Sequence, residues 1–293
     1  MVTVSADYRA IALKALADLP PFSPVLSKLL ASLSTDDVAF GQLATLIERD
    51  TVLSGSVLKL VNSAAYARRG QVSSIAHAIS VLGLTKLRNL ILGLSITRMV
   101  RSAKTTTGWS QANFNMHSVA TAVLTDHLAQ HVPVNYPEGA FIAGLFHDIG
   151  RLLIASGLPE EHREIQRQFE AGNRSLSECE ISVIGISHAG IAALALAEWN
   201  LPSPIQSAVE FHHDPASNHW LGEEKAGERF HLSEIVCAAD EVVNRLGNSI
   251  MPRPQTELDE EPFQPLSTFV GTDLLEKIAE SFSREYTAIR AFF

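Results

Sequence analysis

Residues 141–155, FIAGLFHDIGRLLIA, set a histidine and an aspartate in the middle of an apolar run. The helical spacing of its large apolar side chains predicts one buried helix, with a stripe formed by Phe141, Ile142, Leu145, Phe146, Ile149, Leu152, Leu153 and Ile154. His147 and Asp148 would lose their hydration there, which costs several kcal/mol unless a partner replaces the water. The stretch therefore predicts that a group inside the protein satisfies this pair.

The 293-residue chain has the composition of a folded globular protein, with 46% hydrophobic and 19% charged residues. The net charge of −9 argues against general binding to nucleic acid or to an anionic membrane, because affinity for phosphate requires a basic face. The first residues lack the basic start and apolar core of a signal peptide. No apolar stretch approaches the roughly 20 residues that span a bilayer. We therefore expect a cytoplasmic protein.

Helical periodicity runs through nearly the whole chain, and no sustained alternation with a period of two occurs. The sequence therefore predicts an all-α fold. We expect an N-terminal helical module over residues 1–108, because SAKTTTG at 102–108 has the composition of a linker. A second helical domain is expected over 109–250, and an acidic, proline-rich loop with a docking helix over 251–293. Helices of the second domain are predicted at 109–131, 137–155, 159–171, 175–182, 187–198, 203–212 and 231–246.

Several histidines and acids of the second domain lie in apolar helical segments, where surface residues of these types are not expected. They are His117, His147, Asp148, His188, His212, His213 and Asp240. One such residue alone is more often a hydrogen-bonded core residue, but their recurrence on consecutive helices favours a shared site. The remaining histidines of this domain are expected on solvated faces or loops: His127, His131, His162, His219 and His231.

A metal ion would solve the burial problem of these side chains. Imidazole and carboxylate ligands together suit Zn, Mn, Fe or Ni. A divalent ion would neutralise Asp148 and Asp240 and would use the lone pairs of the neutral imidazoles. We therefore predict one or two divalent ions bound by this set.

The order His117, His147-Asp148, Asp240 resembles the H…HD…D signature of HD-superfamily proteins, which are helical metal-dependent phosphohydrolases. His188 and His212-His213 resemble the additional histidines of two-metal members. Residues 19–245 are similar to the HDOD (HD-related output domain) family, in the segments LPPFSPVLSKLL, LIERDTVLSGSVLKLVNSAAY, SSIAHAISVLGLTKLRNLIL, FIAGLFHDIGRLLIA, ISHAGIAALALAEWNLP and IQSAVEFHH. The resemblance implies an N-terminal helical module packed on an HD-type helical domain.

The chain departs from the hydrolytic branches at three places. Arg151 stands where HDxGK has lysine, and its planar fork is not equivalent to a point charge beside a phosphate. The glycine-rich GYP segment is missing after His213, and Asn113 stands where HD-GYP proteins have a glutamate. These departures argue against a trinuclear centre and leave one or two metals open.

The family resemblance implies a bacterial-type regulator that acts in signal transduction by binding a protein partner or a nucleotide ligand, without turnover. The candidate partner surface is basic and consists of Arg68, Arg69, Lys86 and Arg88.

The alternative is a metal-dependent phosphohydrolase for a nucleotide or cyclic (di)nucleotide. In that case Asp148 would bridge two metals and Arg151 would contact the substrate phosphate. A third reading is a sensor that binds such a nucleotide without cleaving it.

Overall fold

The computed structural model describes residues 8–17, 19, 22–31, 40–63, 66, 71–218, 229–251 and 261–290. These residues form helices and no strand, and an isolated bridge joins Val134 to Phe230. The all-α prediction is confirmed. The sequence Ser34-Thr35-Asp36-Asp37 also predicts a capped helix start, and it lies outside the described residues.

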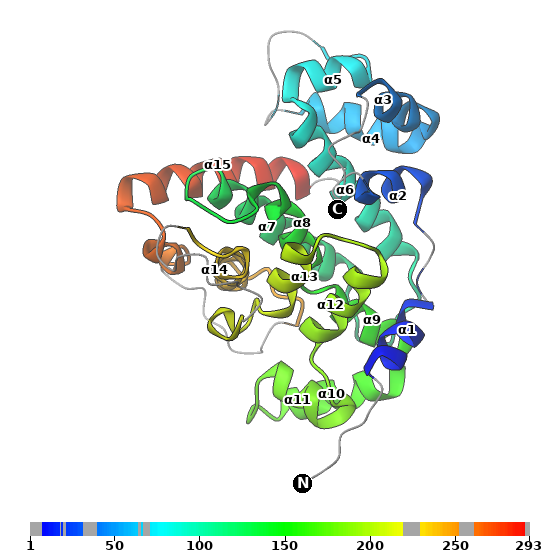
Figure 1. Ribbon diagram of the computed structural model, residues 1–293, viewed down its shortest axis with the longest axis vertical. Helices are drawn as coiled ribbons and strands as arrows, with labels where there is room; N and C mark the ends of the chain where they lie inside the picture. Colours follow the sequence, from blue (N-terminus) through cyan, green and yellow to red (C-terminus); the bar gives the residue numbers. More distant parts are fainter. Residues whose placement is uncertain are drawn as a thin grey trace.

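The first helices are α1 (Tyr8–Ala17), α2 (Pro24–Ala31), α3 (Phe40–Arg49), α4 (Thr51–Val61), α5 (Ile75–Leu82) and α6 (Leu84–Ser102). Figure 1 shows α3, α4 and α5 together at one end of the molecule, and α6 running from them into the main body. Local polar residues fix where these helices begin. Asp50 accepts a hydrogen bond from the Leu53 amide at the start of α4, and Ser74 accepts one from the His77 amide at the start of α5.

The rest of the chain forms α7 (Gln111–Ala129), η1 (Pro137–Gly139), α8 (Ala140–Phe146), α9 (Ile149–Gly157), α10 (Pro159–Glu170), α11 (Leu176–Ile184), α12 (His188–Glu198), α13 (Ser203–Glu210), η2 (Pro215–Ser217), α14 (Leu232–Arg245), η3 (Gln264–Thr268) and α15 (Thr272–Arg290). The helices predicted for this region agree with the observed ones closely, with one exception, the segment 137–155.

The sequence prediction of one continuous helix through 141–155 is wrong at its centre. Helix α8 ends at Phe146 and α9 begins at Ile149, and Asp148 between them has φ −103° and ψ 10°. The Nδ1 atom of His147 donates a hydrogen bond to the Gly144 carbonyl at 2.8 Å, so a side chain satisfies a backbone acceptor at the end of α8. The apolar pattern did not reveal this interruption, because both halves are equally buried.

By length and composition Pro137–Gly157 could cross a membrane, contrary to the expectation that no segment would reach that length. However, 89% of its apolar window is buried inside the fold, which identifies it as part of the core. The pair Leu176–Ile184 and His188–Glu198 passes the same test only when joined across a bend of 71°.

The core is built around α7, which packs against α8, α14 and α15, while α12 packs against α9 and α13. Helix α1 also packs against α9 and α12, although it belongs to the expected N-terminal module. A Cβ atom at Gly157 would lie 2.4 Å from Ala15 Cα, so α1 and α9 are in close backbone contact there. The boundary at 102–108 stays a prediction.

Helix α15 is tied to the N-terminal helices and to α7 through one buried carboxylate, Glu285. It accepts a hydrogen bond from the Tyr66 hydroxyl at 2.7 Å and pairs with Lys86 of α6 at 2.5 Å and with His127 of α7 at 3.1 Å. Burial would raise the pKa of Glu285, but His127, Lys86 and Tyr66 stabilise its charged form and lower the pKa to about 2. His127 is only 9% exposed, so its expected place on a solvated face is wrong.

We predict that Glu285→Ala destabilises the fold by about 3 kcal/mol at neutral pH, because it removes the nearer carboxylate partner of Lys86 and the acceptor of the Tyr66 hydroxyl. Lys86 then keeps only Asp126, at 3.9 Å. The pKa of Glu285 is lowered from 4.5 to about 2, so its stabilisation is present above the ordinary pKa and is lost as the pH falls from 4.5 towards 2. The titratable side chains that face the Glu285 carboxylate are Asp126, Lys86, His127 and Tyr66. Urea unfolding of wild type, Glu285→Ala and Glu285→Gln at neutral pH and at about pH 3 measures this. Equal differences at both pH values would contradict it.

Candidate metal centre

All seven predicted ligand residues come together among the helices from α7 to α14. They lie on α7 (His117), at the α8–α9 junction (His147, Asp148), at the first residue of α12 (His188), just after α13 (His212, His213) and on α14 (Asp240). They form two groups in which one ligand atom of each residue lies within 4.8 Å of the others. Asp148 belongs to both groups.

The first group contains His117, His147, Asp148 and Asp240, and all four are buried. His117 Nε2 lies 3.1 Å from His147 Nε2, 3.3 Å from Asp148 Oδ2 and 3.1 Å from Asp240 Oδ1. His147 Nε2 lies 3.4 Å from the same Asp148 oxygen. Two imidazole nitrogens and two carboxylate oxygens therefore surround one point.

The second group contains Asp148, His188, His212 and His213. The other oxygen of Asp148, Oδ1, lies 3.1 Å from His188 Nε2 and 3.8 Å from His212 Nε2. His188 Nε2 is 2.9 Å from His213 Nε2. His213 is the exposed member, so this group borders solvent, whereas all four residues of the first group are buried.

The protein backbone fixes the orientation of three of the imidazoles. Their Nδ1 atoms lie against carbonyl oxygens, His117 at 2.9 Å from Asn248, His147 at 2.8 Å from Gly144 and His212 at 2.7 Å from Val209. A carbonyl oxygen only accepts, so each Nδ1 carries the proton and each neutral ring presents its Nε2 lone pair to the site. Metal-binding histidines in proteins are commonly oriented in this way.

This arrangement requires a cation. The Nε2 lone pairs of His117 and His147, which face each other at 3.1 Å, repel one another, and Asp148 adds negative charge to both groups. His212 Nε2 and both oxygens of Asp148 are buried without a hydrogen-bond partner among the described residues. A divalent ion in the first group would take the lone pairs of His117, His147 and Asp148 Oδ2, and one in the second group those of His212 and Asp148 Oδ1. The residues present therefore fit such ions.

Without a metal, the cation must be a proton. Burial would lower the pKa of His147, but the charges of Asp148 and Asp240 raise it to about 10. Burial would raise the pKa of Asp148, but Arg151 and His147 hold it well below its usual range. The pKa of His212 is well below its usual value because of burial and the nearby His213 and His147. A metal would therefore displace protons from the first group as it binds.

Sequence reasoning missed the residues that hold the ligands in place. Glu180 of α11 is 2% exposed, and its Oε2 lies 2.6 Å from His188 Nδ1 and 2.7 Å from the His188 amide nitrogen. Asn244 donates to Asp240 Oδ1 at 2.8 Å, and Asn248 supplies the carbonyl for His117. Glu180 lies between Cys179 and Ile181 in a predicted helix. An acidic residue between apolar neighbours in a helix was also the sequence pattern that identified Asp148 and Asp240, so it could have identified Glu180.

Arg151 lies on α9 with its Nε 3.0 Å from Asp148 Oδ1. It is therefore paired with the carboxylate that both groups share, on the side of the second group. Among the other histidines, His162 is 4% exposed and pairs with Thr106, so its expected solvated position is wrong, and His219 lies outside the described residues.

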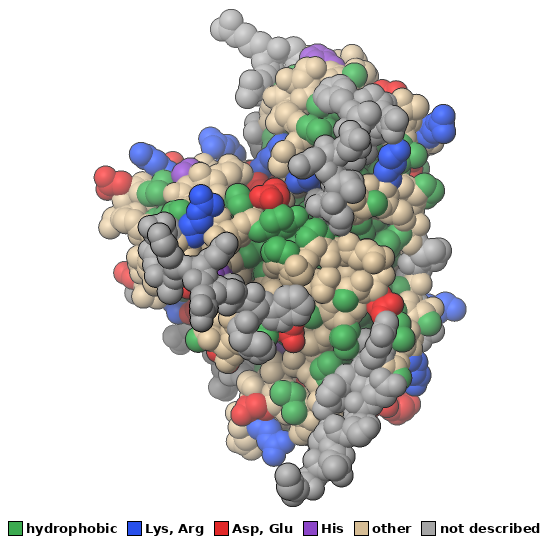
Figure 2. All heavy atoms as spheres, viewed as in Figure 1, with side chains coloured by type: hydrophobic (Ala, Val, Ile, Leu, Met, Phe, Trp, Pro, Cys, Tyr) green, Lys and Arg blue, Asp and Glu red, His purple; other side chains and the backbone are tan. Residues whose placement is uncertain are grey.

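The residues of the predicted basic partner surface are only partly described. Arg68 and Arg69 lie outside the described residues. Lys86 pairs with Glu285, and Arg88 is half-buried and donates to the Glu138 carbonyl at 3.4 Å. On the face drawn in Figure 2, Lys and Arg side chains are interspersed with acidic ones. The docking role of these residues stays a prediction.

The sequence profile of the HDOD domain matches residues 19–215. The chain belongs to the HDOD family. An uncharacterized protein of Treponema pallidum (strain Nichols) is 26% identical over 200 residues, which are 67% of this chain and 38% of that protein. The present chain thus spans well under half the length of this relative.

Solved structures share the fold of this HDOD protein. An HDOD domain protein of unknown function from Geobacter sulfurreducens has a TM-score of 0.76 at 20% identity and covers 98% of both chains. A "putative phosphohydrolase" from Shewanella amazonensis SB2B has a TM-score of 0.74 at 23% identity, covering 97% of this chain and 98% of that one. A "putative metal-dependent phosphohydrolase" from the same organism has a TM-score of 0.58 at 19% identity, covering 97% of each chain. At these identities the likeness establishes the fold alone.

Gly150 allows α9 to approach the start of α12 and thereby brings His188 to Asp148. A Cβ atom at Gly150 would lie 1.9 Å from the His188 carbonyl oxygen, so α9 and α12 would have to separate. We predict that Gly150→Ala destabilises the protein by about 3 kcal/mol through this clash.

Gly55→Ala is the matched control, because a Cβ at Gly55 in α4 would meet nothing within 4 Å. This substitution is expected to stabilise the helix by about 0.5–1 kcal/mol. Chemical denaturation measures both variants, and a Gly150→Ala protein as stable as wild type would contradict the close approach.

Proposed function

We propose that this HDOD protein is a cytoplasmic regulatory protein that acts in signal transduction and uses its HD-type metal centre as a scaffold rather than for turnover. It would act by binding a protein partner or a nucleotide ligand. The observation that carries the proposal is the pairing of Arg151 with Asp148, the residue shared by the two groups. A guanidinium at this oxygen neutralises the carboxylate and repels a second cation on the same side.

The first group supports the same conclusion. His117, His147, Asp148 and Asp240 are four buried protein ligands, as many as a tetrahedral structural ion requires. They come from α7, the α8–α9 junction and α14, so one ion there would tie these elements together. We propose that this group holds one divalent ion of Zn, Mn, Fe or Ni and that its main effect is on stability and shape.

The second candidate function is hydrolysis of a phosphate ester of a nucleotide or cyclic dinucleotide. It is favoured by the exposure of His213, because a substrate could reach the second group from solvent. Two bound divalent ions would lower the pKa of a water molecule and neutralise the charge of the phosphate. In this reading Arg151 would leave Asp148 and bind the phosphate through its two-pronged guanidinium.

We predict that purified protein contains about one equivalent of a divalent metal and that His147→Ala loses most of it, because the first group then keeps only three ligands. His131→Ala is the control, since His131 is exposed and belongs to neither group. Elemental analysis of the three proteins measures this. Equal metal content in wild type and His147→Ala would contradict the assignment of the first group.

The same preparations distinguish the two candidate functions. Loaded with Mn, Fe or Zn, the wild type is expected to release no product from bis(4-nitrophenyl) phosphate, mononucleotides or cyclic dinucleotides. Turnover in the wild type that disappears in His147→Ala, but not in His131→Ala, would establish the hydrolase and refute the scaffold proposal.

A further inference from the structure

The turn that follows α14 contacts two candidate metal ligands that lie on different helices. The carbonyl of Asn248 in this turn accepts a hydrogen bond from His117 Nδ1 at 2.9 Å. Asn244, near the end of α14, donates to Asp240 Oδ1 at 2.8 Å, and its own side-chain oxygen accepts from Ser249 at 2.9 Å. A shift of this turn would therefore disturb the hydrogen bonds of both ligands.

Tyr286 of α15 holds this turn from outside the metal centre. Its hydroxyl donates to Asn248 Oδ1 at 3.1 Å, and the carbonyl of Met116, the residue before His117, lies 3.5 Å from the same hydroxyl. Tyr286 is 7% exposed, and its ring stacks on Phe282 of the same helix with centroids 5.5 Å apart. The position of its hydroxyl is therefore set by the position of α15.

The residue before Tyr286 contacts the N-terminal helices instead. Glu285 accepts a hydrogen bond from the Tyr66 hydroxyl at 2.7 Å and lies 2.5 Å from Lys86 Nζ of α6. Neighbouring residues of an α-helix project about 100° apart, so these two side chains reach different parts of the fold. Figure 1 shows α15 running across α7, with its C-terminal end towards α6.

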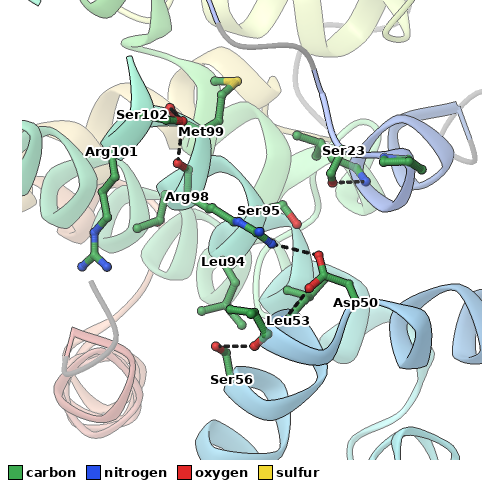
Figure 3. Close-up of a pocket in the computed structure, with 14 residues that line it drawn as sticks. Ser23, Asp50, Leu53, Ser56, Leu94, Ser95, Arg98, Met99, Arg101 and Ser102 are labelled. Atoms are coloured by element: carbon green, nitrogen blue, oxygen red, sulfur yellow. Dashed lines mark hydrogen bonds and ion pairs between the residues drawn. The ribbon is translucent and has the colours of Figure 1, made fainter. Parts of the chain in front are cut away.

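The partners of Glu285 are themselves tied to α4. The side chain of Asn62, just after α4, donates to the Val72 carbonyl and accepts from the Val72 amide, both at 2.8 Å. These two hydrogen bonds close the segment that contains Tyr66. Figure 3 shows that α6 holds the start of α4 through the ion pair of Arg98 with Asp50, at 2.9 Å. A displacement of α4 and α6 would therefore change the contacts that α15 makes through Glu285.

Helix α15 is the rigid element that joins the two sets of contacts. Glu285 and Tyr286 are separated by a rise of about 1.5 Å along the helix, so neither can move without the other. Glu285 is 9% exposed, and its charge is strongly destabilising there without Lys86 and Tyr66. Hydrogen bonds lose most of their strength beyond about 3.5 Å, so a displacement of α15 by about 1 Å would weaken the contacts of both residues together.

We propose that Tyr286 is a positioning residue for His117, and that α15 couples the ion affinity of the first group to the contact of Glu285 with Tyr66 and Lys86. The inference rests on the proposed function, in which an ion at the first group acts on stability and shape. Such a coupling is reciprocal. An ion at the first group favours α15 in its present position, and loss of the Glu285 contacts weakens binding of the ion. The metal centre thereby gains a route to the N-terminal helices.

The Zn²⁺ affinity of the full-length protein, freed of metal and titrated in competition with a chromophoric chelator, tests the proposal. Tyr286→Phe keeps the stacked ring and removes the hydroxyl, and we expect it to bind the first equivalent of Zn²⁺ about tenfold more weakly. Glu285→Gln can still accept from Tyr66 but does not attract the Lys86 charge, and we expect it to bind about threefold more weakly. Glu280→Gln makes the same change of charge at an exposed position of α15 and is expected to bind as wild type does.

The double variant shows whether the effect of Glu285 passes through Tyr286. If it does, Glu285→Gln weakens Zn²⁺ binding in the wild-type background but has little further effect in the Tyr286→Phe background. Tyr66→Phe removes the hydroxyl at the other end of the contact and provides the same test if thermal melting shows that Glu285→Gln is poorly folded. The affinity is measured on folded protein, so a uniform loss of stability leaves it unchanged.

The outcomes separate this inference from the proposed function. Weaker binding in both single variants, with no further loss in the double variant, supports the coupling. Zn²⁺ binding of equal affinity in wild type, Tyr286→Phe and Glu285→Gln would overturn the coupling and leave the scaffold proposal standing. Weaker binding in Tyr286→Phe alone would reduce Tyr286 to a local role and would also overturn the coupling. A wild type that binds no Zn²⁺ would refute the scaffold proposal and this inference together.

Discussion

The carboxylate of Asp148 is the group on which the centre of this structure depends. It is fully buried, and its two oxygens face two different sets of imidazoles. An ionised carboxylate in such a place is stable only when cations or hydrogen-bond donors surround it. In this fold, His117 and His147 lie beside one oxygen of Asp148. The other oxygen faces His188, His212 and Arg151.

Much of the surrounding architecture follows from the need to bring these side chains together. The interruption between α8 and α9 lets His147 bond the Gly144 carbonyl and turns its Nε2 towards Asp148. Gly150 lets α9 approach α12 closely enough for His188 to reach the second oxygen. Tyr286 of α15 donates to the side chain of Asn248, whose carbonyl holds His117. Since Glu285, the residue before Tyr286, binds Tyr66 and Lys86, helix α15 contacts both the N-terminal helices and a residue that orients a candidate metal ligand.

The sequence was sufficient for the helical class, for the ends of most helices and for the seven residues of the centre. These were predictable because a histidine or an aspartate in an apolar helix must have a buried partner. His127 and His162 show the limit of that reasoning, since they are buried through partners on distant elements, Glu285 and Thr106. Glu180 and the carbonyl of Asn248 were not predicted because an orienting contact depends on three-dimensional proximity. The break at Asp148 was missed for a different reason, since apolar periodicity reports burial and not helix continuity.

The account depends on a cation between His117, His147, Asp148 and Asp240. Crystals grown in Mn²⁺ and measured for anomalous scattering at the manganese edge test it most directly. The account predicts one strong peak among these four residues and, because Arg151 pairs with Asp148, a weaker peak or none beside His188 and His212. Absence of any peak between His117 and Asp240, with the side chains in their present positions, would contradict it.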